Sequence, residues 1–390
     1  MISFEEFERL CRAETMRSVE ENLERDPVAI ALDRRVACAA DVATQVKYLQ
    51  RARRKLPSYY EARCIIPQLA FEQSSGEICA ARKDLRGGSV LDLTCGLGVD
   101  AFGLSSRFER VVTVERNEVL AAVARENFRR LGVSGIEVVC DTAEHFASVT
   151  EERFDWCFAD PDRRGADGGK RVLLEDCSPD VTHLIPLLAE RGTASRFCIK
   201  LSPMFDVEEA FRIFGRYGRC SVEAVSSGDE CKEVLVYVDS QREPRLSAVV
   251  ADGGSFSAAW PLEELRPETR PFEPSEYGWA IFPDVALVKA RLVRRCFGGT
   301  GWVSGENGVV FCKERPAEGV LGRVFGIAGI ERYDARRLRR ELKGLGVGIM
   351  LRDVPLTAAR IRQATGLREG GDLQLAFTRA AGEIWVIRLK

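Results

Sequence analysis

Residues 89–100 constrain the fold of this chain more than any other stretch, with the sequence Ser-Val-Leu-Asp-Leu-Thr-Cys-Gly-Leu-Gly-Val-Asp. The apolar residues that lead to Asp92 predict a buried strand, and Gly96 and Gly98 then break the pattern. A helical pattern follows directly. Strand, glycine turn and helix in this order predict the first unit of a nucleotide-binding α/β fold.

Downstream of this turn the chain alternates between strand patterns and helix patterns. Such alternation builds a mostly parallel sheet with helices on both faces. The last two strands are separated only by residues 226–230, so we expect them to pair as an antiparallel hairpin at the edge. The predicted fold class is therefore α/β, with a Rossmann-like seven-stranded sheet. Its expected strands are 89–93, 110–115, 136–140, 154–159, 196–201, 221–225 and 231–238.

Changes in residue composition, in the helix and strand patterns and in charge divide the chain into five expected segments. They are a helical N-terminal lobe (1–75), the α/β core (76–240), a strand pair and linker (241–275), and two small α+β modules (276–320 and 321–390). The last module holds 14 Lys and Arg against 7 Asp and Glu, although the whole chain has a net charge of −2. This basic module is either a solvated surface or a face that binds a polyanion.

The cysteines and the N-terminus indicate the cellular compartment that suits the protein. The 13 cysteines include no Cys-x-x-Cys pair, and only two histidines accompany them. This favours reduced thiols in a cytosol over a disulfide framework, and predicts no metal site. The acidic N-terminus lacks a basic start, and no apolar run nears the ~20 residues of a membrane span. We therefore expect a cytoplasmic protein without a signal peptide.

The glycine turn is compatible with two cofactors. Residues 96–101 match the dinucleotide pattern G-x-G-x-x-A, but acids at the ends of successive strands favour S-adenosylmethionine. Asp92 suits the cationic amine of the methionine group, Glu115 the ribose hydroxyls and Asp141 the adenine amino group. The residues expected at the cofactor are Asp92, Thr94, Cys95, Gly96, Gly98, Glu115 and Asp141, with Gln73, Ser74 and Ser75 positioned to close over it.

Each of these residues also has a structural explanation. The glycines can simply form a tight turn, Glu115 and Asp141 can cap helices, and Asp92 can be a buried partner of a backbone amide. The polar residues 73–75 likewise resemble an ordinary helix start. It is the acids at three successive strand ends, taken together with the glycines, that favour the cofactor site.

The fourth strand ends in Asp160-Pro161-Asp162-Arg163-Arg164, where the carboxyl edge of the sheet binds ligands. The Asp160 carboxylate and the Pro161 carbonyl can accept the two N–H groups of an exocyclic base amine and so direct its lone pair at a methyl donor. Methyltransferases of such amines carry Asp/Asn-Pro-Pro-aromatic here. In this chain Asp162 replaces the second proline, and Arg163 replaces the aromatic residue.

This region also has other interpretations. Arg163 can stack on a base or bind a phosphate, but it can also form a structural ion pair with Asp162 or Glu175. A cysteine nucleophile is not favoured, because Cys157 lies mid-strand and Cys177 has no evident activating partner. The expected catalytic residues are Asp160, Pro161, Asp162 and Arg163.

Together these motifs resemble the class I S-adenosylmethionine-dependent methyltransferases with a C-terminal THUMP-like domain. The resemblance implies a ferredoxin-like module at 276–320 and a THUMP-like module at 321–390. THUMP domains proper serve RNA, notably tRNA, in modification enzymes. The family usually has Asp-Pro-Ala-Arg-Arg where this chain has Asp162 in the middle. The matching residues are 55–58, 72–75, 92–100, Glu115, 127–128, 160–164 and 352–356.

The sequence thus predicts an S-adenosylmethionine-dependent methyltransferase that acts on a base nitrogen of tRNA or rRNA and binds RNA through residues 321–390. The alternatives are a non-catalytic RNA-binding protein with a methyltransferase fold, a methyltransferase of a protein or small molecule, and a dehydrogenase.

Overall fold

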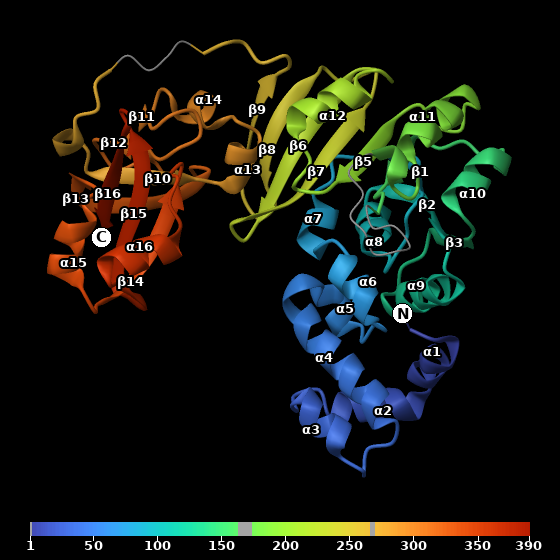
Figure 1. The fold of residues 1–390 in the computed structure, drawn as a ribbon. Helices are drawn as coiled ribbons and strands as arrows, with labels where there is room; N and C mark the ends of the chain where they lie inside the picture. The colour runs from blue at the N-terminus through green and yellow to red at the C-terminus, as the bar shows by residue number, and fades with distance from the viewer. Residues whose placement is uncertain (1, 163–173, 266–269) are drawn as a thin grey trace. The chain divides into compact units, whose positions relative to one another are not determined.

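The structure is a computed structural model that describes residues 2–162, 174–265 and 270–390 (Figure 1). By their internal contacts the residues form two compact units. Unit 1 comprises Met1–Leu201, Arg212–Cys220 and Leu235–Arg242, and unit 2 comprises Ser202–Phe211, Ser221–Val234 and Glu243–Lys390.

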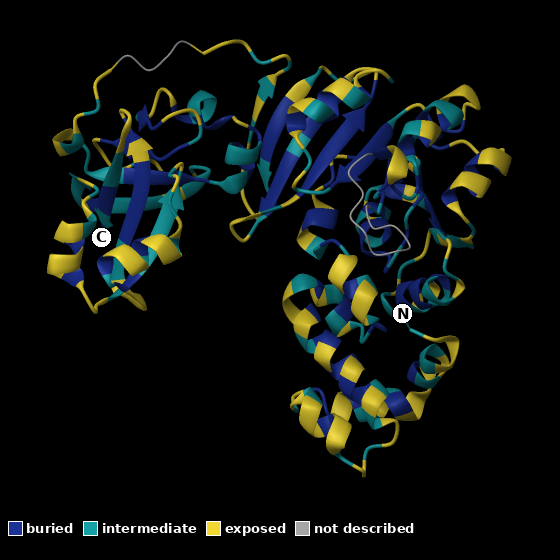
Figure 2. Ribbon diagram, viewed as in Figure 1, coloured by how far each residue is buried: buried dark blue, intermediate teal, exposed yellow. Residues whose placement is uncertain are grey.

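Unit 1 begins with a lobe of helices, as the periodicity of residues 1–75 predicts. Ser3 caps the first helix by accepting a hydrogen bond from the Glu6 amide, and Asp26 caps the third in the same way. The longest helix, α4, buries Val42, Val46 and Leu49 along one face, and Figure 2 shows the exposed residues on the other. The helices are α1 (Phe4–Cys11), α2 (Ala13–Glu21), α3 (Pro27–Leu32), α4 (Ala39–Lys55), α5 (Pro57–Glu61), α6 (Gln68–Gln73) and α7 (Glu77–Ala81).

The larger sheet has the strand order β3-β2-β1-β4-β5-β7-β6-β8-β9. β1 pairs in parallel with β2 and β4, and β4 with β5, so the strands that follow the glycine turn share one direction. β6 and β7 are neighbours joined by a turn at 228–229, as the hairpin prediction requires. The strands are β1 (Gly87–Asp92), β2 (Phe108–Glu115), β3 (Ile136–Cys140), β4 (Trp156–Ala159), β5 (Phe197–Leu201), β6 (Cys220–Ser227), β7 (Glu230–Val238), β8 (Arg245–Val250) and β9 (Ser255–Ala259).

The sheet extends past the hairpin and has nine strands instead of the seven predicted. The strand pair expected within residues 241–275 is β8 and β9, and β8 continues the sheet by pairing in parallel with β6. Leu246 and Ala248 of β8 are fully buried, so the added strand removes apolar surface from water. A local sequence pattern identifies such strands but not their partners.

Helices connect the strands of the Rossmann-like core. Their starts are capped by side chains, such as Asn117 on the Leu120 amide, Thr142 on the His145 amide and Asp180 on the Thr182 amide. The connecting elements are α8 (Val99–Ser105), α9 (Glu118–Arg130), α10 (Ala143–Val149), the short 3₁₀ helix η1 (Leu174–Asp176), α11 (Val181–Glu190) and α12 (Val207–Phe214).

In unit 2 a second sheet has the order β11-β12-β10-β13-β16-β15-β14. Strands from residues 276–320 and from 321–390 pair within it, since β10 is antiparallel to β13. Leu338 of α15 and Ile361 of α16 pack into one apolar core with Phe377 of β15. The elements are η2 (Pro274–Glu276), β10 (Trp279–Pro283), α13 (Val285–Lys289), α14 (Val293–Phe297), β11 (Trp302–Val303), β12 (Val310–Cys312), β13 (Gly322–Arg332), α15 (Ala335–Leu342), β14 (Gly346–Arg352), α16 (Ala358–Thr365), β15 (Arg368–Ala380) and β16 (Glu383–Leu389).

Candidate active site

Four carboxylates stand at the carboxyl ends of neighbouring parallel strands. Asp92 ends β1 and Glu115 ends β2, while Asp141 follows β3 and Asp160 follows β4. In the sheet these strands lie in the order β3-β2-β1-β4. Because parallel strands end at a common edge, the four acids line one edge of the sheet, where ligands of such folds bind.

Asp92 is fully buried, and both its carboxyl oxygens are engaged by neighbours. Oδ1 accepts hydrogen bonds from the Thr94 amide at 2.9 Å and the Thr94 hydroxyl at 3.2 Å, and Oδ2 accepts one from the Thr113 hydroxyl at 2.8 Å. Burial raises the pKa of Asp92 to about 7, although the hydrogen bonds from both threonines work against it. A cation placed beside this carboxylate would relieve the cost of its charge.

The glycine turn is held against Glu115. The Gly96 amide donates to Glu115 Oε2 at 2.9 Å, and the Asn117 amide donates to Oε1 at 2.9 Å. Gly96 has a φ of +54°, and a Cβ added there would meet no heavy atom within 4 Å. The space beside the Gly96 backbone is thus unoccupied by other protein atoms of the described residues. Burial raises the pKa of Glu115.

The second glycine faces protein. Gly98 has a φ of +84°, and an added Cβ would lie 2.5 Å from the Phe128 ring. Cys95, between Thr94 and the turn, is buried, and its amide donates to the Val114 carbonyl at 2.9 Å. Burial raises the pKa of the Cys95 thiol well above its ordinary value. Cys95 and Gly98 therefore shape the turn.

Asp141 is turned toward its own helix. Its carboxylate accepts a hydrogen bond from the Thr142 amide at 2.7 Å and lies 2.7 Å from His145 Nδ1. Its backbone amide donates to the Glu115 carbonyl at 3.2 Å, which places Asp141 directly beside the end of β2.

Asp160 is linked to Asp92 through one hydroxyl group. The Asp160 amide donates to Thr94 Oγ1 at 2.8 Å, and the same hydroxyl donates to Asp92. Pro161 is buried, and Asp162 exchanges two backbone hydrogen bonds with Ser178, at 2.8 and 3.1 Å. Arg163, which the sequence also suggests as catalytic, lies outside the described residues.

Asp160 also takes part in a buried group of charges, here called the lysine–aspartate network: Lys83, Asp100, Lys200 and Asp160, with the Ser75 hydroxyl. Lys83 Nζ lies 2.6 Å from Asp100 Oδ1. Lys200 Nζ lies 3.2 Å from Asp100 Oδ2 and also forms an ion pair with Asp160. Burial alone would raise the pKa of Asp100, but the two lysines outweigh it and hold that pKa far below its ordinary value.

Sequence reasoning missed three members of this network. Lys83, Asp100 and Lys200 were not among the predicted site residues. One signal was available: Lys200 interrupts the apolar strand Phe-Cys-Ile-Lys-Leu, and a charge in a buried strand needs a partner. Two of its partners, Asp100 and Ser75, lie 100 and 125 residues away in sequence, so spacing could not identify them.

The structure separates the three polar residues that precede α7. Ser75 is buried and donates to Asp100 Oδ2 at 2.9 Å, so it belongs to the network. The Ser74 hydroxyl donates to the Phe71 carbonyl at 3.0 Å and closes the end of α6. Gln73, the last residue of α6, is exposed.

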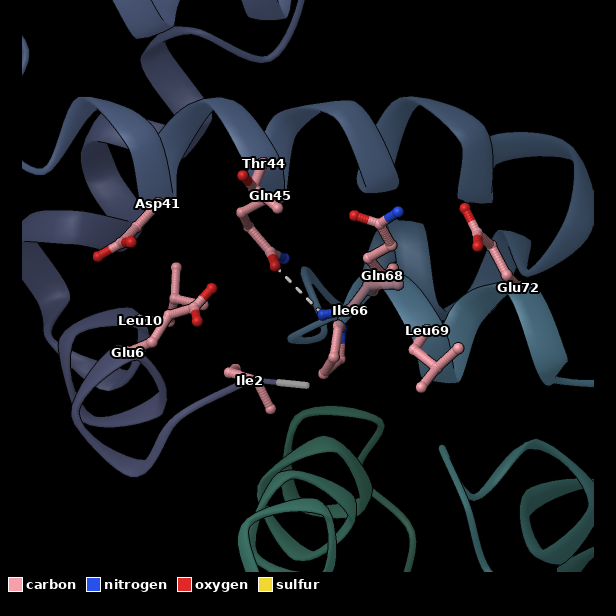
Figure 3. Close-up of a pocket in the computed structure, with 11 residues that line it drawn as sticks. Ile2, Glu6, Leu10, Asp41, Thr44, Gln45, Ile66, Gln68, Leu69 and Glu72 are labelled. Carbon is pink, nitrogen blue, oxygen red and sulfur yellow. Dashed lines mark hydrogen bonds between the residues drawn. The ribbon is translucent and has the colours of Figure 1, made fainter. Parts of the chain in front are cut away.

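A separate cavity of about 440 Å³ lies in the helical lobe and contains none of the strand-end acids (Figure 3). Asp41 at its wall pairs with Arg9 at 2.5 Å, and Glu72 pairs with Arg51 at 3.4 Å. Within the lining, the Gln45 side chain accepts a hydrogen bond from the Ile66 amide at 3.1 Å. The lining residues are Ile2, Glu6, Leu10, Asp41, Thr44, Gln45, Ile66, Pro67, Gln68, Leu69 and Glu72.

Within residues 2–162, 174–265 and 270–390, no three His, Cys, Asp or Glu side chains are grouped so that they could hold a metal ion. No helix in the described part of the chain has the length and apolar character needed to cross a membrane.

The residues at the strand ends fit S-adenosylmethionine. The turn is open at Gly96, where a side chain would otherwise stand, and the buried Asp92 carboxylate favours a cationic neighbour. Glu115 presents two acceptor oxygens beside the same turn. A cationic amine, a ribose and an adenine are the groups that such acceptors recognise.

Comparisons with known proteins agree with this fit. Residues 90–161 match the methyltransferase domain family, and residues 322–390 match the THUMP domain-like family. An uncharacterized S-adenosylmethionine-dependent methyltransferase of Mycobacterium tuberculosis is 28% identical over 305 residues, which cover 76% of this chain and 78% of that protein.

Two further relatives differ in how much of the chain they cover. A tRNA/tmRNA (uracil-C(5))-methyltransferase of Neisseria meningitidis is 30% identical over 106 residues, 23% of this chain and 29% of that protein. The crystal structure of a proposed methyltransferase of Porphyromonas gingivalis W83 covers 100% of this chain and 99% of its own, with a TM-score of 0.76 and 24% identity. That structure supports the fold.

The fold, the glycine turn and these matches define an enzyme that uses S-adenosylmethionine as its cofactor and transfers a methyl group. More closely, the chain is a class I S-adenosylmethionine-dependent methyltransferase with a C-terminal THUMP-like domain.

Proposed function

We propose that the enzyme methylates a nitrogen of an RNA base, with Asp160 as the residue that binds the acceptor amine. The observation that carries this proposal is the way Asp160 is held. Its amide is fixed by Thr94, its carboxylate by Lys200, and its side chain is still 34% exposed. A carboxylate that is fixed but accessible beside the cofactor turn is suited to accept an N–H group.

The chemistry asked of these residues is mainly orientation. S-adenosylmethionine supplies an activated methyl group when bound. The Asp160 carboxylate and the Pro161 carbonyl accept the two N–H groups of an exocyclic amine, which directs the nitrogen lone pair toward the methyl group. For the cofactor, we propose that Asp92 faces the methionine amine, Glu115 the ribose and Asp141 the adenine.

A base nitrogen is favoured over a pyrimidine carbon as the acceptor. A pyrimidine carbon needs a nucleophilic side chain that first adds to the ring, and a cysteine acts in this way only as a thiolate. Burial raises the pKa of Cys157, which disfavours its thiolate form. Some relatives are nevertheless named as uracil-C(5)-methyltransferases.

RNA is supported as the substrate by the charge of the THUMP-like module. Helix α15 exposes Arg336, Arg339 and Arg340, and none of the three forms an ion pair with a carboxylate of the described residues. Arg337 on the same helix is instead paired with Glu331 at 2.8 Å. A row of unpaired guanidinium groups suits a phosphate backbone, so we propose that residues 321–390 form the RNA-binding module.

The test is methyl transfer to RNA from a strain that lacks this gene. Purified enzyme and tritium-labelled S-adenosylmethionine are incubated with that RNA, and the nucleosides are then identified by mass spectrometry. We expect one N-methylated nucleoside, with a rate at least about 100-fold lower in Asp160→Ala, which removes the acceptor oxygens. Asp176→Ala, an exposed carboxylate in η1, is the matched control and keeps the rate.

Other outcomes would favour the alternatives. Incorporation into protein or a small molecule, and none into RNA, would overturn the proposed substrate. RNA binding with no incorporation into any fraction would favour a non-catalytic RNA-binding role. A C-methylated pyrimidine would contradict the proposed acceptor atom.

A further inference from the structure

Lys200 occupies a position where a charge is costly. It lies on β5, all five residues of which are buried, and its side chain is only 9% exposed. Burying an ammonium group is strongly unfavourable unless every proton finds an acceptor. A lysine kept at such a place needs either a structural or a functional explanation, and its contacts distinguish between the two.

The three N–H groups of Lys200 have three acceptors. Nζ lies 2.7 Å from Ser75 Oγ and 3.2 Å from Asp100 Oδ2, and it forms an ion pair with Asp160 Oδ2. Asp100 does not depend on Lys200 alone, because Lys83 Nζ also pairs with it at 2.6 Å. The contact of Lys200 with Asp160 is the one that joins this pair of aspartate and lysine side chains to the end of β4.

Among the described residues, the charges around this contact include the two lysines and the carboxylates of Asp92, Asp100 and Asp160. Asp100 lies between Lys83 and Lys200, and its charge acts on Asp92, which Thr94 links to the Asp160 amide. Lys200 is thus a cation of the network in direct contact with the partly exposed carboxylate at the end of β4.

We infer that Lys200 is a positioning residue that keeps the Asp160 carboxylate ionised and fixes its orientation for the acceptor amine. This inference rests on the proposed role of Asp160. It makes Asp160 a hydrogen-bond acceptor rather than a general base, because an adjacent ammonium group disfavours protonation of the carboxylate. When the acceptor nitrogen forms its bond to the methyl carbon, the bond from that carbon to sulfur breaks and the surplus proton of the nitrogen goes to water.

The test compares two variants of Lys200. Lys200→Met removes the cation from Asp100 and Asp160, whereas Lys200→Arg, the matched control, keeps a cation at this position. We expect the acidic limb of the kcat profile to move up by about 1–3 pH units in Lys200→Met, because an opposite charge at contact distance lowers a carboxyl pKa by about that much. In Lys200→Arg the limb returns toward that of the unmodified enzyme.

A second measurement needs no methyl acceptor. The carbon-13 shift of the Asp160 carboxyl, assigned with Asp160→Asn, should titrate at higher pH in Lys200→Met than in the unmodified enzyme. If Lys200→Met does not fold, as judged by thermal unfolding and by binding of S-adenosylhomocysteine, Lys200→Gln carries the same test with a neutral amide that can still bond Ser75.

The two proposals fail in different ways. An Asp160→Ala variant with full activity would overturn the proposed role of Asp160, while the carboxyl titration would still test the effect of Lys200. Conversely, an inactive Asp160→Ala combined with an unmoved acidic limb and an unmoved Asp160 titration in Lys200→Met would overturn the inference about Lys200 alone.

Discussion

Replacing Asp92 by asparagine should stabilise the protein at high pH and weaken its binding of the cofactor. The Asp92 carboxyl is fully buried, and its pKa rises from an ordinary value of 3.8 to about 7 in the folded chain. The folded state therefore holds the Asp92 proton more tightly than the unfolded state. This stabilisation is complete below pH 3.8 and is lost as the pH rises toward 7.

The size of the effect follows from the shift. About three pKa units correspond to about 4 kcal/mol of unfolding free energy, which the ionised Asp92 costs the protein above about pH 7. Asparagine cannot ionise, so Asp92→Asn avoids this cost. The new amide group faces the Thr113 hydroxyl, which has to turn into an acceptor, and this rearrangement costs on the order of 1 kcal/mol at every pH.

The assay is urea unfolding of both proteins without cofactor, with circular dichroism as the signal, at several pH values between about pH 4 and about pH 8. The stability advantage of Asp92→Asn should grow by about 4 kcal/mol between about pH 4 and about pH 8. Calorimetry at the upper pH should show weaker binding of S-adenosylhomocysteine, whose amine would lose the anionic partner that we propose for it. As a second perturbation, Thr113→Val removes a hydrogen bond that lowers the Asp92 pKa. In this variant the stability that the protein loses as the pH rises should therefore continue to fall up to a higher pH than in the unmodified protein. A stability difference between Asp92→Asn and the unmodified protein that is the same at all pH values would refute the reasoning.

Three further predictions concern the turn, the thiols and the basic module. Gly98→Ala should destabilise the fold by about 2 kcal/mol or more, because the backbone φ is +84° and the added Cβ meets the Phe128 ring. Gly96→Ala should cost only about 1 kcal/mol of stability but should weaken the binding of S-adenosylhomocysteine. Thermal unfolding measures the stability of both variants, and calorimetry measures their binding. Cys157→Ala should retain methyl transfer within about threefold, and loss of activity with intact folding would point to a thiol nucleophile instead. Arg339→Glu should weaken RNA binding and flatten its salt dependence by about one to two units of slope, while Arg17→Glu, an exposed arginine of α2, should change neither in filter-binding titrations.

The Rossmann-like core was predictable because its signals are local. Apolar runs, glycines and capping residues lie within a few positions of one another, and parallel strand direction then brings Asp92, Glu115 and Asp160 to a single edge. The attachment of β8 to β6 was not predictable, because a short strand carries no information about which edge it will join.

The lysine–aspartate network could not be predicted from the sequence for a related reason. Whether Lys200 meets Asp160 depends on β4 and β5 being neighbours, which is a property of strand order. By contrast, Asp141 and His145 are separated by one helical turn, and their contact follows from spacing alone. Sequence reasoning identified the acids at the strand ends but missed Asp100 and the two lysines that pair with it.

The hydroxyl of Thr94 has a consequence for which residues this position tolerates. A hydroxyl has a single proton, and Thr94 uses it toward Asp92, so the oxygen is left to receive the Asp160 amide. The two hydrogen bonds therefore run in one direction, from the Asp160 amide through Thr94 to the Asp92 carboxylate. Serine could reproduce this polarity, whereas valine would keep the shape but remove the hydroxyl that links the residue proposed for the methyl acceptor to the residue proposed for the cofactor.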